Sequence, residues 1–286
     1  MIRTRRRIMD FAVPWIMRAV MYILALVVGY IIFDIVWNGR HVISREFIFG
    51  MPHKGGSEGG IWPAIVGTIF LVAGTVVVAL PLGMAAAVYL SEYARRNAFT
   101  AAVRLAIVTL AGVPSIVYGL FGLGLFVIFL NFGTSILAGS LTLACMILPV
   151  IIVASEESLR AVPQSLREGS LALGATKWQT IRSNVLPYSV PGMLTGSILG
   201  VGRAAGEAAP ILLTVAAFYL PILPDSVYDQ VMALPYHLYV LATQHPDAAK
   251  VRPLQYGTAL VLLVLVLGMN LGAIILRNQF RKRFRW

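Results

Sequence analysis

Six long apolar stretches constrain the fold of this chain more than any other feature of its sequence. An α-helix needs about 20 apolar residues to cross the roughly 30 Å hydrocarbon core of a bilayer. Stretches of that length cover residues 15–36, 61–90, 105–130, 136–154, 188–219 and 256–276. Because 58% of the residues are hydrophobic and only 12% are charged, we predict an all-α polytopic membrane protein with six transmembrane helices. The second and fifth stretches are longer than a membrane span, so they must tilt or break.

The basic residues sit at the ends of the apolar stretches, which indicates a membrane topology and argues against nucleic-acid binding despite the net charge of +11. When loops are assigned alternately to the two sides, 17 basic residues fall on one side and 5 on the other. The positive-inside rule then places both termini and residues 166–187 on the cytoplasmic side. The membrane is expected to be the inner (plasma) membrane of the cell. The basic start before the first apolar stretch is interpreted as a retained anchor, because that stretch is too long for a signal peptide.

This topology predicts one transmembrane domain over residues 1–286. Within it, residues 1–60 form an N-terminal anchor helix and the first external loop, and residues 277–286 form a basic cytosolic tail. Residues 61–276 form the core, with a cytosolic loop at residues 155–187.

No pattern for catalysis or for a cofactor is found in the sequence. The phosphate-binding pattern GxxxxGK[ST] is absent, so ATP hydrolysis is expected to belong to another chain. The only cysteine, Cys145, lies inside an apolar stretch and has no intramolecular partner. The histidines lack metal-ligand spacing; they are His41, His53, His237 and His245. We therefore expect a non-enzymatic subunit without metal or cofactor.

Residues 166–187 are polar and lie between apolar stretches, and their pattern predicts two short helices. Gly174 is typical of the left-handed residue that ends a helix, and Thr176 with Gln179 forms a capping box that begins the second one. One strip of the second helix is apolar and available for burial, whereas Lys177 and Arg182 point elsewhere. The strip consists of Trp178, Ile181 and Val185. A plain helical connector is the alternative interpretation.

The same hairpin resembles the EAA-x3-G-x9-I-x-LP loop of permease subunits of ABC importers. Glu168, Gly174, Leu186 and Pro187 match that pattern. Ala, Ala and Ile of the pattern are replaced by Gly169, Ser170 and Asn184. In that family the loop is a coupling helix that inserts into a cleft of the ATPase subunit. The resemblance assigns this role to Glu168, Gly174, Thr176, Trp178, Leu186 and Pro187.

Five further segments resemble, in order, the permeases of phosphate ABC importers. They are GGIWPAIVGT (59–68), YLSEYA (89–94), LAGVPSIVYGLFGL (110–123), LAGSLTLACMILPVII (137–152) and GRAAGEAAP (202–210). The resemblance implies the type I ABC importer permease fold and the import of inorganic phosphate across the inner membrane. It also implies three kinds of protein partner: two copies of an ATP-binding subunit, a sister permease, and a phosphate-binding protein that is periplasmic or a lipoprotein.

Arg203 falls near the middle of the fifth stretch, where an arginine costs about 2.5–3.5 kcal/mol on insertion scales. Glu207 lies four residues on, so the two side chains can share one helix face and form an ion pair. One hypothesis is that Arg203 faces the pathway and gives phosphate a transient site. The alternative is a structural ion pair. Ser115 and Tyr118 are candidate hydroxyl donors to the ion, with ordinary packing as their alternative.

Small residues and prolines predict close packing and breaks. Gly192, Gly196, Gly200 and Gly206 have the spacing that lets another helix approach closely, either from this chain or from a second permease.

Pro114 predicts a break near the cytosolic start of the third stretch, which is either a gate or a static kink. Residues 220–255 are too polar to span and are expected to fold on the outer surface.

Three other functions remain open at this point. The chain could carry another oxyanion such as sulfate or molybdate, because an arginine alone does not define the anion. It could be a secondary transporter with Arg203 and Glu207 as a proton relay. It could also be a membrane scaffold or sensor that transports nothing.

Overall fold

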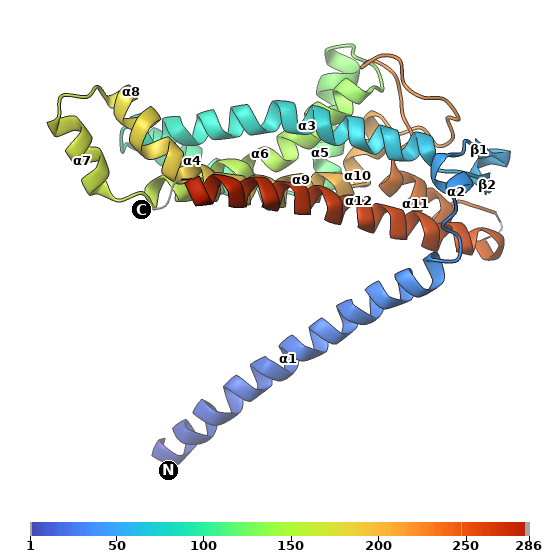
Figure 1. Cartoon of the computed structure of the whole chain (residues 1–286), viewed down its shortest axis with the longest axis horizontal. Helices are drawn as coiled ribbons and strands as arrows, with labels where there is room; N and C mark the ends of the chain where they lie inside the picture. The colour runs from blue at the N-terminus through green and yellow to red at the C-terminus, as the bar shows by residue number, and fades with distance from the viewer. Residues whose placement is uncertain (1, 247, 284–286) are drawn as a thin grey trace.

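The chain folds into a bundle of long helices, with one helix leading away from it (Figure 1). A computed structural model describes residues 2–246 and 248–283, with side chains for residues 13–246 and 249–280. The longer helices are α1 (Ile2–Gly39), α3 (Trp62–Val88), α4 (Ala98–Leu110), α5 (Ser115–Gly122), α6 (Ile136–Arg160), α7 (Gln164–Ala172), α9 (Leu186–Gly206), α11 (Leu234–Thr243) and α12 (Ala248–Arg283). The shorter elements are α2 (Arg45–Phe49), β1 (Pro52–His53), β2 (Glu58–Gly59), α8 (Lys177–Thr180) and α10 (Ala209–Thr214).

Five helices of the described chain are long and apolar enough to cross a membrane, and a bent helix pair brings the number to six if it counts as one span. The bent pair is α4 and α5, whose axes differ by 106°. Pro114 is the residue before α5, so the break predicted in the third apolar stretch is confirmed at that proline. The prediction of six helical spans holds in this sense.

The core lies where α3, α6 and α9 pack side by side, with α6 in the centre. In the most apolar window of α6, 67% of the residues are buried, whereas the corresponding share for α12 is 0%. Small residues let α3 and α6 approach closely, since a Cβ on Gly83 would lie 2.6 Å from Ile151 Cγ2. The hydroxyl of Thr75 on α3 also donates to the carbonyl of Ser140 on α6 at 3.3 Å.

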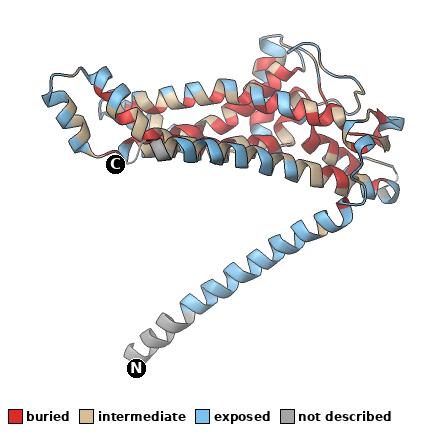
Figure 2. Cartoon of the chain, viewed as in Figure 1, coloured by how far each residue is buried: buried red, intermediate tan, exposed pale blue. Residues whose placement is uncertain are grey.

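The first helix, α1, is attached to the bundle only near its end (Figures 1 and 2). Gly39 lies against α12, where a Cβ would come within 2.7 Å of the Tyr256 carbonyl. The Tyr256 hydroxyl donates to Asp34 Oδ2 at 3.0 Å. None of the apolar window of α1 is buried, although its sequence is as apolar as that of the core helices. The side chains of residues 1–12 and 281–286, which include the basic start and most of the predicted basic tail, lie outside the described side chains.

The fifth predicted span, residues 188–219, is wrong in its extent. The helix begins earlier, because α8 continues through a π-helical turn (Ile181–Val185) into α9 without a break from Lys177 to Gly206. It ends at Gly206, and Glu207 has extended backbone angles (φ −80°, ψ 130°). After Glu207 the short helix α10 begins with Pro210 in its first turn, a position where proline's missing N–H costs nothing.

Residues 220–255 were expected on the outer surface, and the structure corrects this for α11. This helix is inserted into the core, with His237, Val240 and Leu241 buried. Its preceding residues are equally buried, and the amide of Leu234 donates to Thr68 Oγ1 on α3 at 2.8 Å. The segment was misjudged because its prolines and tyrosines lower its mean hydropathy, while its amphipathic helix still has one apolar face to bury.

Candidate coupling and translocation sites

The hairpin of α7 and α8 projects from one end of the bundle (Figure 1). The turn between its helices contains Gly174 in the left-handed region (φ +84°), which glycine adopts at the least cost. Thr176 accepts a hydrogen bond from the Gln179 amide, and the Gln179 side chain accepts one from the Thr176 amide. The predicted capping box is therefore confirmed. The hydroxyl groups of Ser170 and Thr180, 3.0 Å apart, join the two arms of the hairpin.

The tip of the hairpin exposes large apolar side chains. Leu173 is 91% exposed, Trp178 is 53% exposed and Leu171 is 50% exposed. Of the predicted apolar strip, Ile181 and Val185 are buried in this chain, whereas Trp178 stays exposed because α8 begins beyond the end of the bundle. Glu168 is exposed as well, whereas Leu186 and Pro187 are half-buried at the start of α9. An exposed apolar tip of this kind marks a contact surface for a partner.

Arg167 fastens the hairpin to the rest of the bundle. Its guanidinium donates to Glu92 Oε1 at 2.8 Å, to the Val162 carbonyl at 2.6 Å and to the Leu159 carbonyl at 2.8 Å. The Arg167 and Glu92 side chains are only 13% and 10% exposed. Glu92 lies in the π-helical turn Tyr89–Tyr93 that ends α3, so the pair joins the hairpin to α3. Sequence reasoning missed this pair, because 75 residues separate its members and no local spacing connects them.

The second arm of the hairpin is the start of the long helix that runs from Lys177 to Gly206. At 1.5 Å per residue, its 30 residues extend about 45 Å. Trp178 lies at one end of this helix and Arg203 at the other. The hairpin and the part of the chain that carries Arg203 are therefore joined by one continuous helix.

Arg203 occupies the last turn of α9, where the partial negative charge of the helix C-terminus favours a cation. Its Nε lies 3.3 Å from Glu207 Oε1. The two residues do not share one helix as the spacing implied, because Glu207 stands at the break and reaches back to Arg203. The pair is loose: the Arg203 side chain is 39% exposed and that of Glu207 is 19% exposed.

The side of α9 that carries Arg203 faces away from the chain's own core. The exposed residues of α9 lie along one face: Thr195, Leu199, Arg203 and Gly206. Three of the four predicted packing glycines lie on the other side. A Cβ on Gly192 or Gly196 would collide with Ser158 or Ala154 of α6, and one on Gly200 would lie 3.5 Å from Ile147 Cβ. The helix that approaches these three glycines is therefore α6 of the same chain, whereas a Cβ on Gly206 would meet no described atom within 4 Å.

Ser115 and Tyr118 lie at the start of α5, which packs against α10 just after the break. The Tyr118 hydroxyl donates to the Leu110 carbonyl at 2.8 Å, across the bend between α4 and α5. In this arrangement Tyr118 closes the bend and its proton is not available to an anion. Ser115 is half-buried in the first turn of α5.

No group of three or more histidine, cysteine, aspartate or glutamate side chains suited to a metal ion occurs among the described residues.

Comparison with known proteins places this arrangement in a family. Residues 79–286 match the family model of binding-protein-dependent transport system inner membrane components. The chain is 39% identical over 232 residues to the phosphate transport system permease protein PstA 1 of Mycobacterium tuberculosis strain H37Rv, covering 79% of this chain and 72% of that one. It is also 34% identical over 275 residues to the probable ABC transporter permease protein YqgI of Bacillus subtilis, covering 91% and 92%.

The fold agrees with this result. A chain of the methionine ABC transporter MetNI, in an inward-facing conformation, superposes with a TM-score of 0.61 at 17% identity. The superposition covers 77% of this chain and 97% of that one. The chain thus belongs to the inner membrane components of binding-protein-dependent transport systems, as a multi-pass permease with the type I ABC importer fold.

Proposed function

We propose that this chain is a permease subunit that moves inorganic phosphate into the cytoplasm, with Arg203 in the pathway. The observation that carries the proposal is the loosely held, half-exposed Arg203 on the most exposed face of α9. A guanidinium presents several N–H donors to the oxygens of a tetrahedral anion. The name of the PstA relative, which is a phosphate transport permease, favours phosphate over sulfate and molybdate.

The proposal includes an orientation and a set of partners. The hairpin end of the bundle, with both termini, faces the cytoplasm, in accord with the 17 to 5 distribution of basic residues. A sister permease covers the exposed face of α9, so that the pathway runs between the two subunits. Two ATP-binding subunits receive the hairpins of the two permeases. The end that contains α2, β1 and β2 receives the phosphate-binding protein.

The mechanism follows from the continuous helix. The exposed apolar tip, with Leu173 and Trp178, docks on the ATP-binding subunit. Closure of the ATP-binding subunits draws the hairpin with them, and the Arg167–Glu92 pair carries α3 along. The helix that begins at Lys177 tilts as a unit and moves Arg203 between a position that meets phosphate and one that releases it.

Glu207 makes the site reversible. A carboxylate 3.3 Å away competes with phosphate for the same guanidinium, so the ion is held less tightly than it would be by an arginine without that partner. Phosphate displaces Glu207 on entry, and Glu207 displaces phosphate on exit. The ion therefore meets attraction that offsets its dehydration without being trapped.

The test is labelled phosphate uptake by cells that lack this chain, complemented with wild type, Arg203→Ala or Arg203→Lys. Uptake should return with wild type, should be inhibited by arsenate more than by sulfate, and should persist after an uncoupler because ATP drives it. Arg203→Ala should lower uptake at least tenfold with normal amounts of protein in the membrane. Full uptake by Arg203→Ala would show that the arginine is structural, and competition by sulfate rather than arsenate would show another oxyanion as cargo.

A further inference from the structure

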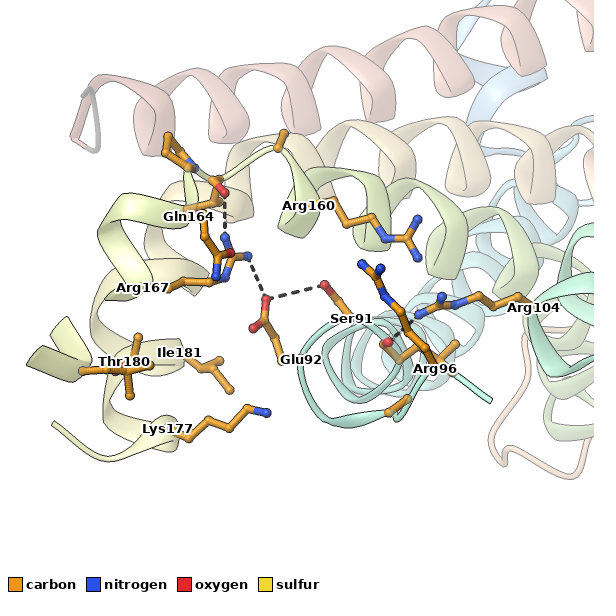
Figure 3. Close-up of a pocket in the computed structure, with 16 residues that line it drawn as sticks. Ser91, Glu92, Arg96, Arg104, Arg160, Gln164, Arg167, Lys177, Thr180 and Ile181 are labelled. Carbon is orange, nitrogen blue, oxygen red and sulfur yellow. Dashed lines mark hydrogen bonds and ion pairs between the residues drawn. The ribbon is translucent and has the colours of Figure 1, made fainter. Parts of the chain in front are cut away.

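A pocket of about 930 Å³ lies beside the coupling hairpin (Figure 3). Its walls come from three parts of the chain: the turn after α3, the side of α4, and the segment from the end of α6 through the hairpin. The pathway described above runs along α9, and none of the residues that line this pocket belongs to α9. The pocket therefore requires an explanation of its own.

The lining of the pocket is strongly basic. Five cations line it: Arg96, Arg104, Arg160, Arg167 and Lys177. Glu92 is the only carboxylate among the lining residues, and Glu156 lies next to them. The pocket region therefore carries three positive charges in excess.

The two carboxylates do not neutralise the arginines evenly. Glu92 is used by Arg167, whose guanidinium is also occupied by two carbonyl groups. A single oxygen of Glu156 serves both Arg104, at 2.8 Å, and Arg160, at 2.6 Å. One carboxylate shared by two guanidinium groups leaves one of their charges uncompensated.

Two arginines have N–H donors without a partner among the described residues. The Nε of Arg104 is buried and has no hydrogen bond within the part of the chain that the structure describes. Arg96 has no hydrogen bond or ion pair with any residue in 2–246 or 248–283. Figure 3 shows the guanidinium groups of Arg96 and Arg160 directed toward each other beside Arg104. Like charges brought together at a half-enclosed surface repel one another unless an anion lies between them.

We propose that this pocket binds a phosphate-type anion between Arg96, Arg104 and Arg160, and that the bound anion slows transport. Arginine groups in this arrangement match the oxygens of a phosphate group, which accept several charge-assisted hydrogen bonds. The anion is either free inorganic phosphate or the phosphate monoester of an anionic lipid such as phosphatidic acid. The regulation rests on the proposed function, because it assumes that the hairpin faces the cytoplasm and that phosphate is the cargo.

The expected direction of the effect follows from the walls of the pocket. Arg160 is the last residue of α6, just before the segment that leads to α7, whereas Arg96 and Arg104 lie on the turn after α3 and on α4. An anion that joins these elements fixes the end of α6 to α4, and with it the point from which the hairpin starts, and the hairpin must move to drive the long helix. Phosphate that accumulates on the cytoplasmic side would then slow its own import.

The test uses the complete transporter, with its ATP-binding subunits and sister permease, in vesicles of neutral phosphatidylcholine, with the phosphate-binding protein supplied outside the vesicles. Uptake of labelled phosphate is driven by ATP inside the vesicles and compared with and without several millimolar phosphate inside. Arg96→Gln removes a guanidinium from the pocket. Arg95→Gln is the matched control, because it removes the same charge from the neighbouring residue, which does not line this pocket. Binding of labelled phosphate to the same complexes is measured without ATP.

Phosphate inside the vesicles should lower wild-type and Arg95→Gln uptake at least threefold. Arg96→Gln should keep its uptake without internal phosphate and need roughly tenfold more internal phosphate for the same inhibition, the equivalent of about 1.4 kcal/mol. If inhibition appears only when phosphatidic acid is added to the vesicles, and is again weakened in Arg96→Gln alone, the ligand is the lipid headgroup.

Equal inhibition of Arg96→Gln and Arg95→Gln would overturn the proposal. So would an Arg96→Gln transporter that loses uptake without any phosphate or phosphatidic acid present, because Arg96 would then contact an acidic group of the ATP-binding subunit. The proposed function fails in a different way, through a wild-type transporter that takes up no phosphate at all. Even then, a difference in phosphate binding between Arg96→Gln and Arg95→Gln would still report on the pocket.

Discussion

Two Arg–Glu pairs, Arg167–Glu92 between the hairpin and α3 and Arg203–Glu207 at the end of α9, differ in almost every physical respect. Arg167 is 13% exposed and gives hydrogen bonds to a carboxylate and two carbonyl groups. Arg203 is 39% exposed and has, among the described residues, one ion pair, at 3.3 Å, with a glutamate at a helix break. The first pair holds two elements together. The second leaves most of its donors free for another ligand.

This difference shows how one type of ion pair serves two purposes. When a guanidinium is buried and its donors are occupied, its removal leaves a desolvated carboxylate, so the pair resists exchange. When it is exposed and has one partner, the pair contributes little to stability and can exchange partners. The predictions below test this distinction, starting with the largest effect on stability.

Arg167→Gln should strongly destabilise the permease, because Glu92 would remain buried without its cation. The cost of breaking a buried pair is about 3–5 kcal/mol, which corresponds to a melting temperature lower by about 10 °C for a chain of this size. Thermal unfolding of the purified permease measures the change. Arg203→Gln is the control and should shift the melting temperature by about 2 °C or less. Equal shifts for the two variants would show that the two pairs are alike.

His237 is a buried ionisable side chain without an opposite charge, so its charged form is also expected to destabilise the fold. It lies on α11 with its Nδ1 unpartnered among the described residues, and burial lowers its pKa from 6.5 to about 4. His237 takes up a proton at higher pH in the unfolded chain than in the folded chain. Its full contribution to the free energy of unfolding is therefore present above about pH 6.5, and this contribution falls as the pH decreases toward 4. A shift of this size corresponds to about 3 kcal/mol.

The measurement is the melting temperature of the wild type and of His237→Phe between pH 7 and pH 4. The part of the acid loss that belongs to His237 should disappear in the variant. His53→Gln, at an exposed histidine, should leave the pH dependence as it is in the wild type. If His237→Phe had the same pH profile as the wild type, a different group would be responsible for the loss.

Much of the fold could be predicted from the sequence because its elements are specified locally. The apolar stretches, the break at Pro114 and the capping box at Thr176 depend on residues that are close together in the chain, and the structure has all three. The buried position of α11 could not be predicted, because it depends on how that amphipathic helix meets α3 and α12. The end of α9 at Gly206 was missed for a related reason, since the apolar composition continues through α10.

The candidate sites divide in the same way. Arg203 and Glu207 were found from a spacing of four, and the hairpin was found from its motif. The Arg167–Glu92 pair and the basic pocket join segments that are far apart in the sequence. In the sequence alone, an arginine of the pocket cannot be distinguished from the other basic residues that flank membrane-spanning helices on the cytoplasmic side. Which of the many basic residues at that end converge is decided by tertiary packing alone.

The junction between α9 and α6 must stay rigid if the long helix is to move as a unit. Gly196→Leu places a side chain where Ala154 of α6 already lies, and overpacking of this kind costs about 1–3 kcal/mol. The melting temperature should fall by several degrees. Gly268→Ala is the control, since a Cβ there meets no described atom within 4 Å, and it should be neutral or slightly stabilising. A stable Gly196→Leu permease would mean that α9 and α6 separate easily.

The smallest expected effect is also the most specific test of the loose pair. If Glu207 competes with phosphate for Arg203, then Glu207→Gln should let the arginine hold phosphate more tightly. Tighter binding lowers the KM for uptake, and slower release lowers the maximal rate, each by up to about tenfold or 1.4 kcal/mol. If the pair had only a structural role, Glu207→Gln would lower transport only in proportion to the loss of folded protein. The KM for uptake would then stay unchanged. Saturation curves of phosphate uptake for Glu207→Gln, set against the membrane content of the permease, separate the two roles, because only a competing carboxylate lowers both constants in a fully folded protein.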